Sequence, residues 1–331
     1  MKNEELIEKT LNEISKDSSW EERYEEYADA ILKHEKIHSI LNKRVSVKFP
    51  LSKYTSISKL KQGKVEMDIR FLGQSIGTLF LDKSENIPKF KKNKNLANID
   101  TGIPKLESEE NWSGKNMKKL RSFLHIIEVK DANTHSSEHK CENLLLREFS
   151  KRESKGKSLV NIQPITFDRE FFQLTTNLKA SRKGEVSYSK NGGGIDIMAR
   201  VRHKDNKVYI AVFELKDQNN TQEPMSDVIQ QALSYAVFIA KLLDSKAGAK
   251  WMRIFGYKGQ CPKVIDVVGI IPKGKETFVE GEYKVGNYTL QTHTLYFDKE
   301  KLFSNEKSDF SGTFTDLLLN PNSNKSTNTN Q

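Results

Sequence analysis

Three side chains that could bind a divalent cation and activate water occur close together in the middle of the sequence: Asp196, Glu214 and Lys216. The two carboxylates offer hard oxygen ligands, which suit Mg²⁺ or Mn²⁺. A neighbouring ammonium group can orient or help to deprotonate a water molecule held by such an ion, and it can offset charge that builds up on a phosphate. These residue types indicate metal-assisted hydrolysis of a phosphate ester.

A β-hairpin is expected to position these three side chains. Residues 195–201 and 208–213 are two apolar runs, and the polar residues 202–207 join them. Side chains alternate across a strand, so Glu214 and Lys216 share one face at the end of the second run. Charged groups that end a buried strand are usually paired or bound to a ligand.

The length of the hairpin loop decides whether the two carboxylates meet. With a three-residue loop at 204–206, counting outward along the antiparallel pair places Asp196 opposite Glu214, on the same face. With a two-residue loop at 205–206, Asp196 would lie opposite Leu215, and the carboxylates would point to different faces unless a bulge intervened. We expect the three-residue loop. The simpler alternative for the whole motif is a surface ion pair between Glu214 and Lys216, with Asp196 as a turn residue after the glycines.

The pattern Asp196…Glu214-Leu215-Lys216 resembles the signature of the PD-(D/E)XK nuclease superfamily, which includes restriction endonucleases, Holliday-junction resolvases and RecB-type nucleases. The proline that names the motif is replaced by Ile195. The resemblance implies an α/β fold with a restriction-endonuclease-like αβββαβ core and a mixed sheet. It also implies that Asp196, Glu214 and the backbone carbonyl of Leu215 hold Mg²⁺ (or Mn²⁺) while DNA phosphodiester bonds are hydrolysed.

In that superfamily the helix before the first core strand often carries an acidic residue that leans towards the metal. A helix is expected at 138–151, and Glu142 is our candidate because it lies three residues before Leu145, on the apolar stripe. Glu138 and Glu148 remain alternatives. Any of the three could instead be a solvated charge on the helix surface.

Gln231 and Tyr235 lie one turn apart on a further helix expected at 224–243, which begins with a proline in its first turn. The pair matches the QxxxY element that RecB-like members carry in the helix after the catalytic strand. The resemblance implies hydrogen bonds from the Gln amide and the Tyr hydroxyl to the DNA backbone or to the lysine. The alternative is two amphipathic residues at the rim of a buried helix.

The expected elements follow the order of the αβββαβ core, and the resemblance covers residues 137–272. They are a helix at 138–151, strand regions at 160–166 and 171–178, the hairpin, the helix at 224–243 and a strand at 263–272.

The remaining segments are expected to form additional elements around this core. They are a helical opening at 1–43 with an aromatic face that would serve core or partner packing, period-two strands through 45–49, 65–71 and 74–80 with a turn at 73–75, a linker or long loop at 83–115, a helix at 117–129 and a hairpin at 276–297.

We therefore expect three parts. Residues 1–110 would form an N-terminal helical and antiparallel β domain, with a sensor or partner-binding role. Residues 111–303 would form the nuclease domain, and residues 304–331 a flexible tail.

Composition narrows the class of partner. The 331-residue chain carries a formal net charge of +10, which favours a polyanion, and the metal-type motif favours nucleic acid over an anionic membrane surface. The lysines of the 83–115 segment, Lys89, Lys91, Lys92 and Lys94, would contact phosphates or remain solvated. Two distant cysteines suggest neither a zinc site nor a disulfide framework. The opening residues lack the apolar core of a signal peptide and no run is long enough for a membrane span, so we expect a cytoplasmic protein.

Together these features predict a Mg²⁺-dependent nuclease, most simply of DNA. The alternative is a catalytically inactive nucleic-acid-binding module of the same fold. A bacterial defence or restriction nuclease, either self-associated or controlled by a protein partner through residues 1–110, would fit this layout by analogy.

Overall fold

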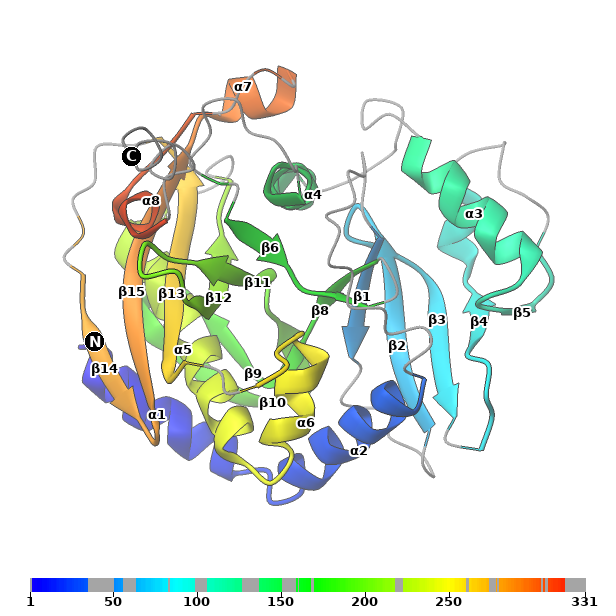
Figure 1. Cartoon of the computed structure of the whole chain (residues 1–331), viewed down its shortest axis with the longest axis horizontal. Helices are drawn as coiled ribbons and strands as arrows, with labels where there is room; N and C mark the ends of the chain where they lie inside the picture. Colours follow the sequence, from blue (N-terminus) through cyan, green and yellow to red (C-terminus); the bar gives the residue numbers. More distant parts are fainter. Residues whose placement is uncertain are drawn as a thin grey trace, which may run out of the picture.

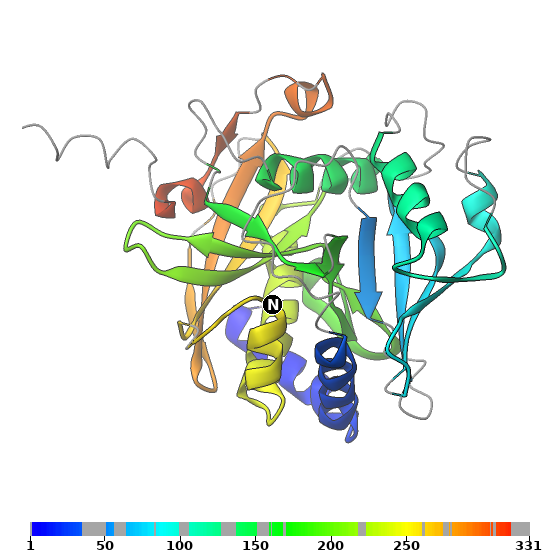
Figure 2. The same ribbon diagram turned by 45° about the vertical axis from the view of Figure 1, so that its right-hand side comes forward.

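The computed structural model describes residues 2–34, 51–55, 64–82, 84–98, 106–126, 137–150, 159, 161–167, 170–217, 223–259, 262–273, 278, 280–304, 306 and 309–318. The described residues form a mixed α/β fold with two seven-stranded sheets and one two-stranded sheet. Figures 1 and 2 show the two larger sheets side by side. No helix in these ranges is long and apolar enough to cross a membrane.

One larger sheet is mixed and holds the predicted hairpin. Its strands, in spatial order, are β14 (Glu282–Val285), β15 (Tyr288–Phe297), β13 (Val264–Pro272), β12 (Val208–Leu215), β11 (Ile197–Arg202) and β6 (Ile162–Pro164), and β16 (Phe310–Ser311) also pairs with β15. The β6–β11 and β11–β12 pairs are antiparallel, whereas β12–β13 and β13–β15 are parallel. We call it the hairpin sheet.

Helices cover both faces of the hairpin sheet. One face packs against α5 (Met225–Asp244), which contacts β12, β13 and β15. The apolar residues of α5 leave almost no polar side, as expected for a buried helix. The other face packs against α4 (Ser137–Ser150), α7 (Lys299–Ser304) and α8 (Thr313–Leu317), which share a second hydrophobic cluster with the sheet.

The other larger sheet contains the antiparallel strands predicted for the first third of the chain. Its order is β5 (Glu109–Asn111), β4 (Lys89–Lys92), β3 (Gln74–Asp82), β2 (Lys64–Phe71), β1 (Leu51–Thr55), β8 (Glu170–Gln173) and β7 (Thr166–Phe167). We call it the N-terminal sheet, although β7 and β8 come from the second half of the chain. The β1–β8 pair is its one parallel pair among the described strands, and α3 (Lys115–Ile126) follows β5.

The two opening helices pack on the later part of the chain. α1 (Asn3–Ser15) contacts α5, and α2 (Trp20–Lys33) contacts α6 (Gly248–Ile254). The Trp20 and Phe238 rings lie 5.5 Å apart, and the Trp251 indole donates a hydrogen bond of 3.0 Å to the Tyr24 carbonyl. The aromatic face predicted for this region therefore serves core packing. Figure 1 shows the two helices in blue along the lower edge of the structure.

A short antiparallel hairpin follows β8 of the N-terminal sheet in the sequence and precedes β11 of the hairpin sheet. It consists of β9 (Thr175–Ser181), the 3₁₀ turn η3 (Arg182–Gly184) and β10 (Glu185–Gly194). Its register is irregular between Tyr188 and Gly193, where Gly192 adopts a φ of 67°. This hairpin therefore leads directly into the predicted site at Asp196.

Several sequence predictions need correction. The expected strand at 171–178 is two strands, β8 and β9, which belong to different sheets because Leu174 breaks the run between them. The lysine-rich run at 89–94 is not a loop, since residues 89–92 form β4, whose Phe90 is buried, and residues 94–98 form the 3₁₀ turn η1 (Lys94–Asn98). The turn predicted at 73–75 centres instead on Leu72 and Gly73, both at positive φ.

The strand region predicted at 160–166 is likewise divided, because β6 belongs to the hairpin sheet and β7 to the N-terminal sheet. A further set of predicted elements agrees with the structure in type and position. They are the helices α3, α4 and α5, the strands β2, β3 and β13, and the β14–β15 hairpin. The strand predicted at 45–49 and residues 319–331 of the predicted tail lie outside the described residues. The division into domains stays a prediction.

Candidate active site

The β11–β12 hairpin has the predicted register. Ile197 pairs with Phe213 and Arg202 with Val208, and the backbone N–H of His203 donates to the Lys207 carbonyl at 3.1 Å. The loop is therefore the three residues 204–206. Asp196 is one residue before β11, so counting outward by one pair places it opposite Glu214.

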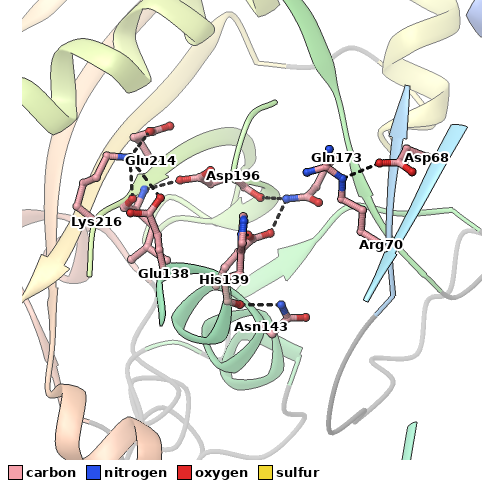
Figure 3. A network of polar contacts seen from close by, with 11 residues as sticks. Asp68, Arg70, Glu138, His139, Asn143, Gln173, Asp196, Glu214 and Lys216 are labelled. Atoms are coloured by element: carbon pink, nitrogen blue, oxygen red, sulfur yellow. Dashed lines mark hydrogen bonds and ion pairs between the residues drawn. The ribbon is translucent and has the colours of Figure 1, made fainter. Parts of the chain in front are cut away.

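The two carboxylates and the lysine of the motif meet at this strand end (Figure 3). Asp196 Oδ2 accepts a hydrogen bond of 2.8 Å from the Leu215 backbone N–H. Lys216 Nζ donates to Glu214 Oε1 at 2.7 Å and to the Leu215 carbonyl at 3.1 Å. Glu214 is 5% exposed, and its second oxygen, Oε2, is buried without a hydrogen-bond partner. An unpaired buried carboxylate oxygen is costly unless something else binds it.

The first turns of α4 bring further charged groups to the site. Glu142 lies three residues after His139 and four after Glu138, so it is a neighbour of each on the helix surface. Glu138 Oε1 is 3.6 Å from Lys216 Nζ, and His139 Nδ1 is 3.4 Å from Glu142 Oε2. The preferred candidate Glu142 and the alternative Glu138 therefore both belong to this cluster. The other alternative, Glu148, lies near the Arg147 guanidinium at 4.0 Å.

Three carboxyl groups of the site, those of Glu214, Asp196 and Glu142, have pKa values above their ordinary values. Burial, followed by the charge on Asp196, raises the pKa of Glu214 to about 8. Burial also raises the pKa of Asp196, and burial together with the Asp196 charge raises the pKa of Glu142. Buried carboxylates of this kind are stabilised by a proton or a cation between them.

The lysine is held in its charged form. Burial alone would lower the pKa of Lys216, but the charges on Glu214 and Asp196 outweigh burial and raise the pKa above its ordinary value. Lys216 is therefore an ammonium group at neutral pH, a donor and not a base.

The two residues of the QxxxY element take different places. Tyr235 is buried, and the pKa of its hydroxyl is raised by burial and then by the Glu214 charge. A Cβ added to Gly193 would lie 2.7 Å from that hydroxyl, so Tyr235 also packs against the chain just before Asp196.

Gln231 is turned towards another partner. Its Nε2 donates to Glu223 Oε2 at 3.0 Å, and Glu223 Oε1 accepts from Arg182 Nε at 2.6 Å. In the described part of the chain no hydrogen bond joins Gln231 to Asp196, Glu214 or Lys216. Glu223 therefore links Gln231 of α5 to Arg182 at the tip of the β9–β10 hairpin.

Sequence reasoning missed Gln173, His139 and Arg70. Gln173 Nε2 donates to the Asp196 carbonyl at 2.6 Å and to Glu142 Oε1 at 2.5 Å. Figure 3 shows Arg70, paired with Asp68 at 2.7 Å, beside Gln173. Gln173 and Arg70 belong to strands of the N-terminal sheet, so no motif spacing could reveal them.

The donor set fits a hard divalent cation. Asp196, Glu214 and the Leu215 carbonyl offer oxygen ligands, and Glu214 Oε2 has no other partner. Among the described residues, no group of three or more His, Cys, Asp or Glu side chains could hold a metal ion. A Mg²⁺ site does not require one, because Mg²⁺ keeps several waters and takes one or two carboxylates together with substrate phosphates.

Three comparisons with known proteins complete this description. The chain matches no protein-family model, no curated protein and no solved structure. What the protein does is therefore inferred from the geometry of this site and from the order of its elements.

Proposed function

We propose that the protein is a metal-dependent nuclease whose active site is the strand end that carries Asp196, Glu214 and Lys216. The observation that carries the proposal is the buried Glu214 Oε2 without a hydrogen-bond partner, on a carboxylate that faces Asp196 and is bonded to Lys216. Perturbed carboxylates beside a charged lysine are a recurrent feature of catalytic sites.

The order and direction of the elements support a restriction-endonuclease-like core. The elements α4, β6, β11, β12, α5 and β13 occur in the chain as helix, three strands, helix and strand. Two insertions interrupt this order, the β7–β10 segment before β11 and the short helix α6 before β13. In space β6, β11, β12 and β13 are neighbours, the first three antiparallel and the last parallel to β12. This order and these strand directions support the proposal of an αβββαβ core.

The residues have separable roles in this proposal. Asp196, Glu214 and the Leu215 carbonyl would hold the ion, and Glu142 would join them directly or through water. A bound Mg²⁺ or Mn²⁺ would lower the pKa of a water and neutralise charge on the phosphate. Lys216, being an ammonium group, would orient the attacking water and stabilise the negative charge of the pentacoordinate phosphate. Tyr235 would keep the carboxylates and the preceding glycines in place.

The charge of the chain supports a nucleic-acid substrate. The net charge of +10 favours a polyanion. α3 adds the exposed lysines Lys115, Lys118 and Lys119, which lie on the side opposite its buried residues Leu120 and Leu124.

The proposal is tested by incubating the purified full chain with plasmid, linear duplex and single-stranded DNA and with RNA. Each reaction contains Mg²⁺, Mn²⁺ or a chelator. We expect cleavage with either metal and none in chelator, and we expect Glu214→Gln to abolish it. Cleavage by Glu214→Gln at the wild-type rate would contradict the assignment of Glu214 to the active site.

A second candidate is a module that binds nucleic acid without cleaving it. One observation favours it: the Lys216 ammonium already pairs with Glu214 Oε1 and contacts the Leu215 carbonyl, so the protein itself supplies a cation to two of the proposed metal ligands. Unchanged DNA affinity in chelator, together with no heat of Mn²⁺ binding in calorimetry, would select this module over the nuclease.

A further inference from the structure

The amide of Gln173 reaches the active site from the other sheet. Gln173 ends β8, which pairs in parallel with β1 of the N-terminal sheet in a register that joins Tyr54 to Gln173. Its side chain is buried, with 1% of the residue exposed. It therefore cannot contact a nucleic-acid substrate and must act through its neighbours.

The two contacts of Gln173 define which end of the amide faces the site. Both partners, Glu142 Oε1 at 2.5 Å and the Asp196 carbonyl at 2.6 Å, are acceptors. The NH₂ end must therefore face them, and both of its hydrogens are used. The amide oxygen of Gln173 is buried and has no hydrogen-bond partner. Because the amide nitrogen donates to both Glu142 and Asp196, the amide oxygen is left without a donor, which costs stability.

These contacts hold Asp196 at a point where the strand ladder does not. Asp196 precedes the first residue of β11, so its backbone lies just outside the paired register. Gln173 binds its carbonyl, and the backbone N–H of the preceding Ile195 donates to the Leu174 carbonyl at 3.1 Å. The Leu215 N–H binds its carboxylate from the other side. Asp196 is thus fixed between β8 and β12.

The same amide fixes the acidic residue of α4. Glu142 is buried, and Gln173 binds its Oε1 while His139 lies 3.4 Å from its Oε2. A carboxylate held on one oxygen presents the other in a defined direction. Without the amide, Glu142 would be free to turn away from Asp196, because two neighbouring carboxylates repel each other.

We propose that Gln173 is a positioning residue that aligns Asp196 and Glu142 for metal binding, and that the N-terminal sheet thereby forms part of the active-site support. The inference rests on the proposed function, because it concerns the ion that the nuclease would use. Partners of this kind, which hold the ligands without touching the metal, change metal affinity or activity by about 10- to 100-fold when they are replaced.

The test compares Gln173→Met, which keeps the length and removes both donors, with Gln173→Asn, which keeps the amide but is one methylene too short to reach both acceptors. Gln291→Met is the matched control, since Gln291 bonds Glu282 at 3.0 Å on the sheet surface. Titration calorimetry with MnCl₂ measures metal affinity directly, without substrate. We expect both Gln173 variants to bind Mn²⁺ about 10- to 100-fold more weakly, and Gln291→Met to match wild type.

Kinetics and a double-mutant cycle provide independent measurements. With DNA as substrate, kcat at fixed Mn²⁺ should fall in both Gln173 variants while KM for DNA stays unchanged, and excess Mn²⁺ should restore part of kcat. In a Glu142→Gln background, Gln173→Met should weaken Mn²⁺ binding less than it does in wild type, since residues that act through one another are not additive.

The outcomes separate the two proposals. A wild-type protein that neither binds Mn²⁺ nor cleaves overturns the nuclease and this inference together. Wild-type binding and cleavage with equal Mn²⁺ affinity in wild type, Gln173→Met and Gln173→Asn overturns this inference alone. A lower Tm in chelator with unchanged Mn²⁺ affinity has the same meaning, because Gln173 would then serve the fold and not the site.

Discussion

Asp196 and Leu215 are joined across the hairpin, the Leu215 backbone N–H donating to Asp196 Oδ2 at 2.8 Å. This bond draws the first carboxylate of the site against the strand that carries Glu214 and Lys216. The carboxylate pair is therefore a consequence of main-chain geometry as well as of side-chain type. A substitution at Asp196 that keeps an acceptor at Oδ2 should leave this geometry intact and remove only the charge.

Asp196→Asn tests the charge by itself. The variant retains an oxygen that can accept the Leu215 N–H but offers the cation a neutral ligand, so we expect cleavage to fall by at least about 100-fold, in line with the several kcal/mol that a bound metal supplies. Asp205→Asn, the same change in the exposed loop of the same hairpin, should cleave at the wild-type rate. Single-turnover rates measure both, and a twofold or smaller decrease in Asp196→Asn would contradict the assigned role.

Metal binding should be visible in stability. A ligand that binds only the folded state adds about 2.7 kcal/mol at a concentration 100 times its Kd, so Mn²⁺ should raise the wild-type Tm. The rise should disappear in the Asp196→Asn/Glu214→Gln double variant, since both ligand charges are gone. Thermal unfolding in MnCl₂ and in chelator gives the comparison. An equal rise in both proteins would place the ion elsewhere.

A second polar cluster predicts how stability depends on pH. The fully buried Asp266 lies 2.8 Å from His203 Nε2 and 3.7 Å from His293 Nε2, and His293 Nδ1 lies 2.7 Å from Glu280 Oε1. Burial lowers the pKa of His293, but the nearby Asp266 carboxylate, followed by Glu280, raises it above 6.5 overall. The stabilisation is therefore complete below pH 6.5 and is lost as pH rises through the folded-state pKa.

Urea unfolding at pH 6 and at pH 8.5 checks this prediction. The pKa of the Asp266 carboxyl is lowered because its hydrogen bond to His203 and the nearby His293 outweigh burial. Its contribution is lost only as pH falls below 3.8, so it does not interfere in this window. We expect His293→Gln to lose less stability than wild type between the two pH values. A pH dependence equal to that of wild type would show that His293 does not titrate with folding.

Salt dependence should locate the nucleic-acid surface on α3. Lys115, Lys118 and Lys119 are exposed on a helix without acidic residues, whereas Lys89 of β4 lies 3.0 Å from Glu85 and 3.6 Å from Glu109. Replacing the three α3 lysines by Gln should weaken binding of all duplexes alike. It should also flatten the plot of log K against log salt by about 0.9 for each phosphate that the protein no longer neutralises.

The control replaces Lys89, Lys91, Lys92 and Lys94 together, which should change this slope less because part of their charge is already compensated. Lys92 also donates to the Leu106 carbonyl. A larger effect of the β4 set than of the α3 set would place the phosphate-binding surface on β4, in agreement with the lysine run of the sequence.

The sequence determined the parts of the site that depend on local pattern. The alternation of β11 and β12 and the three-residue loop between them are short-range features, so they predict that Asp196 lies opposite Glu214. The 3.6-residue period likewise predicts α4 and α5, and with α4 the approach of Glu142. The register, these helices and the mixed α/β class are confirmed. The nuclease activity and its metal stay predictions.

Only the tertiary structure decided the contacts made between distant segments. The sequence of residues 171–178 predicts one strand. In the structure its first part, β8, pairs with β1 and its second part, β9, pairs with β10. The sequence misses this division because a local pattern does not specify the partner of a strand. For the same reason the lysine run at 89–94 contains β4, since β3 and β5 offer it hydrogen bonds on both sides. Gln173 enters the site from the N-terminal sheet, and Gln231 turns to Glu223, because each amide bonds the acceptors that folding brings within reach.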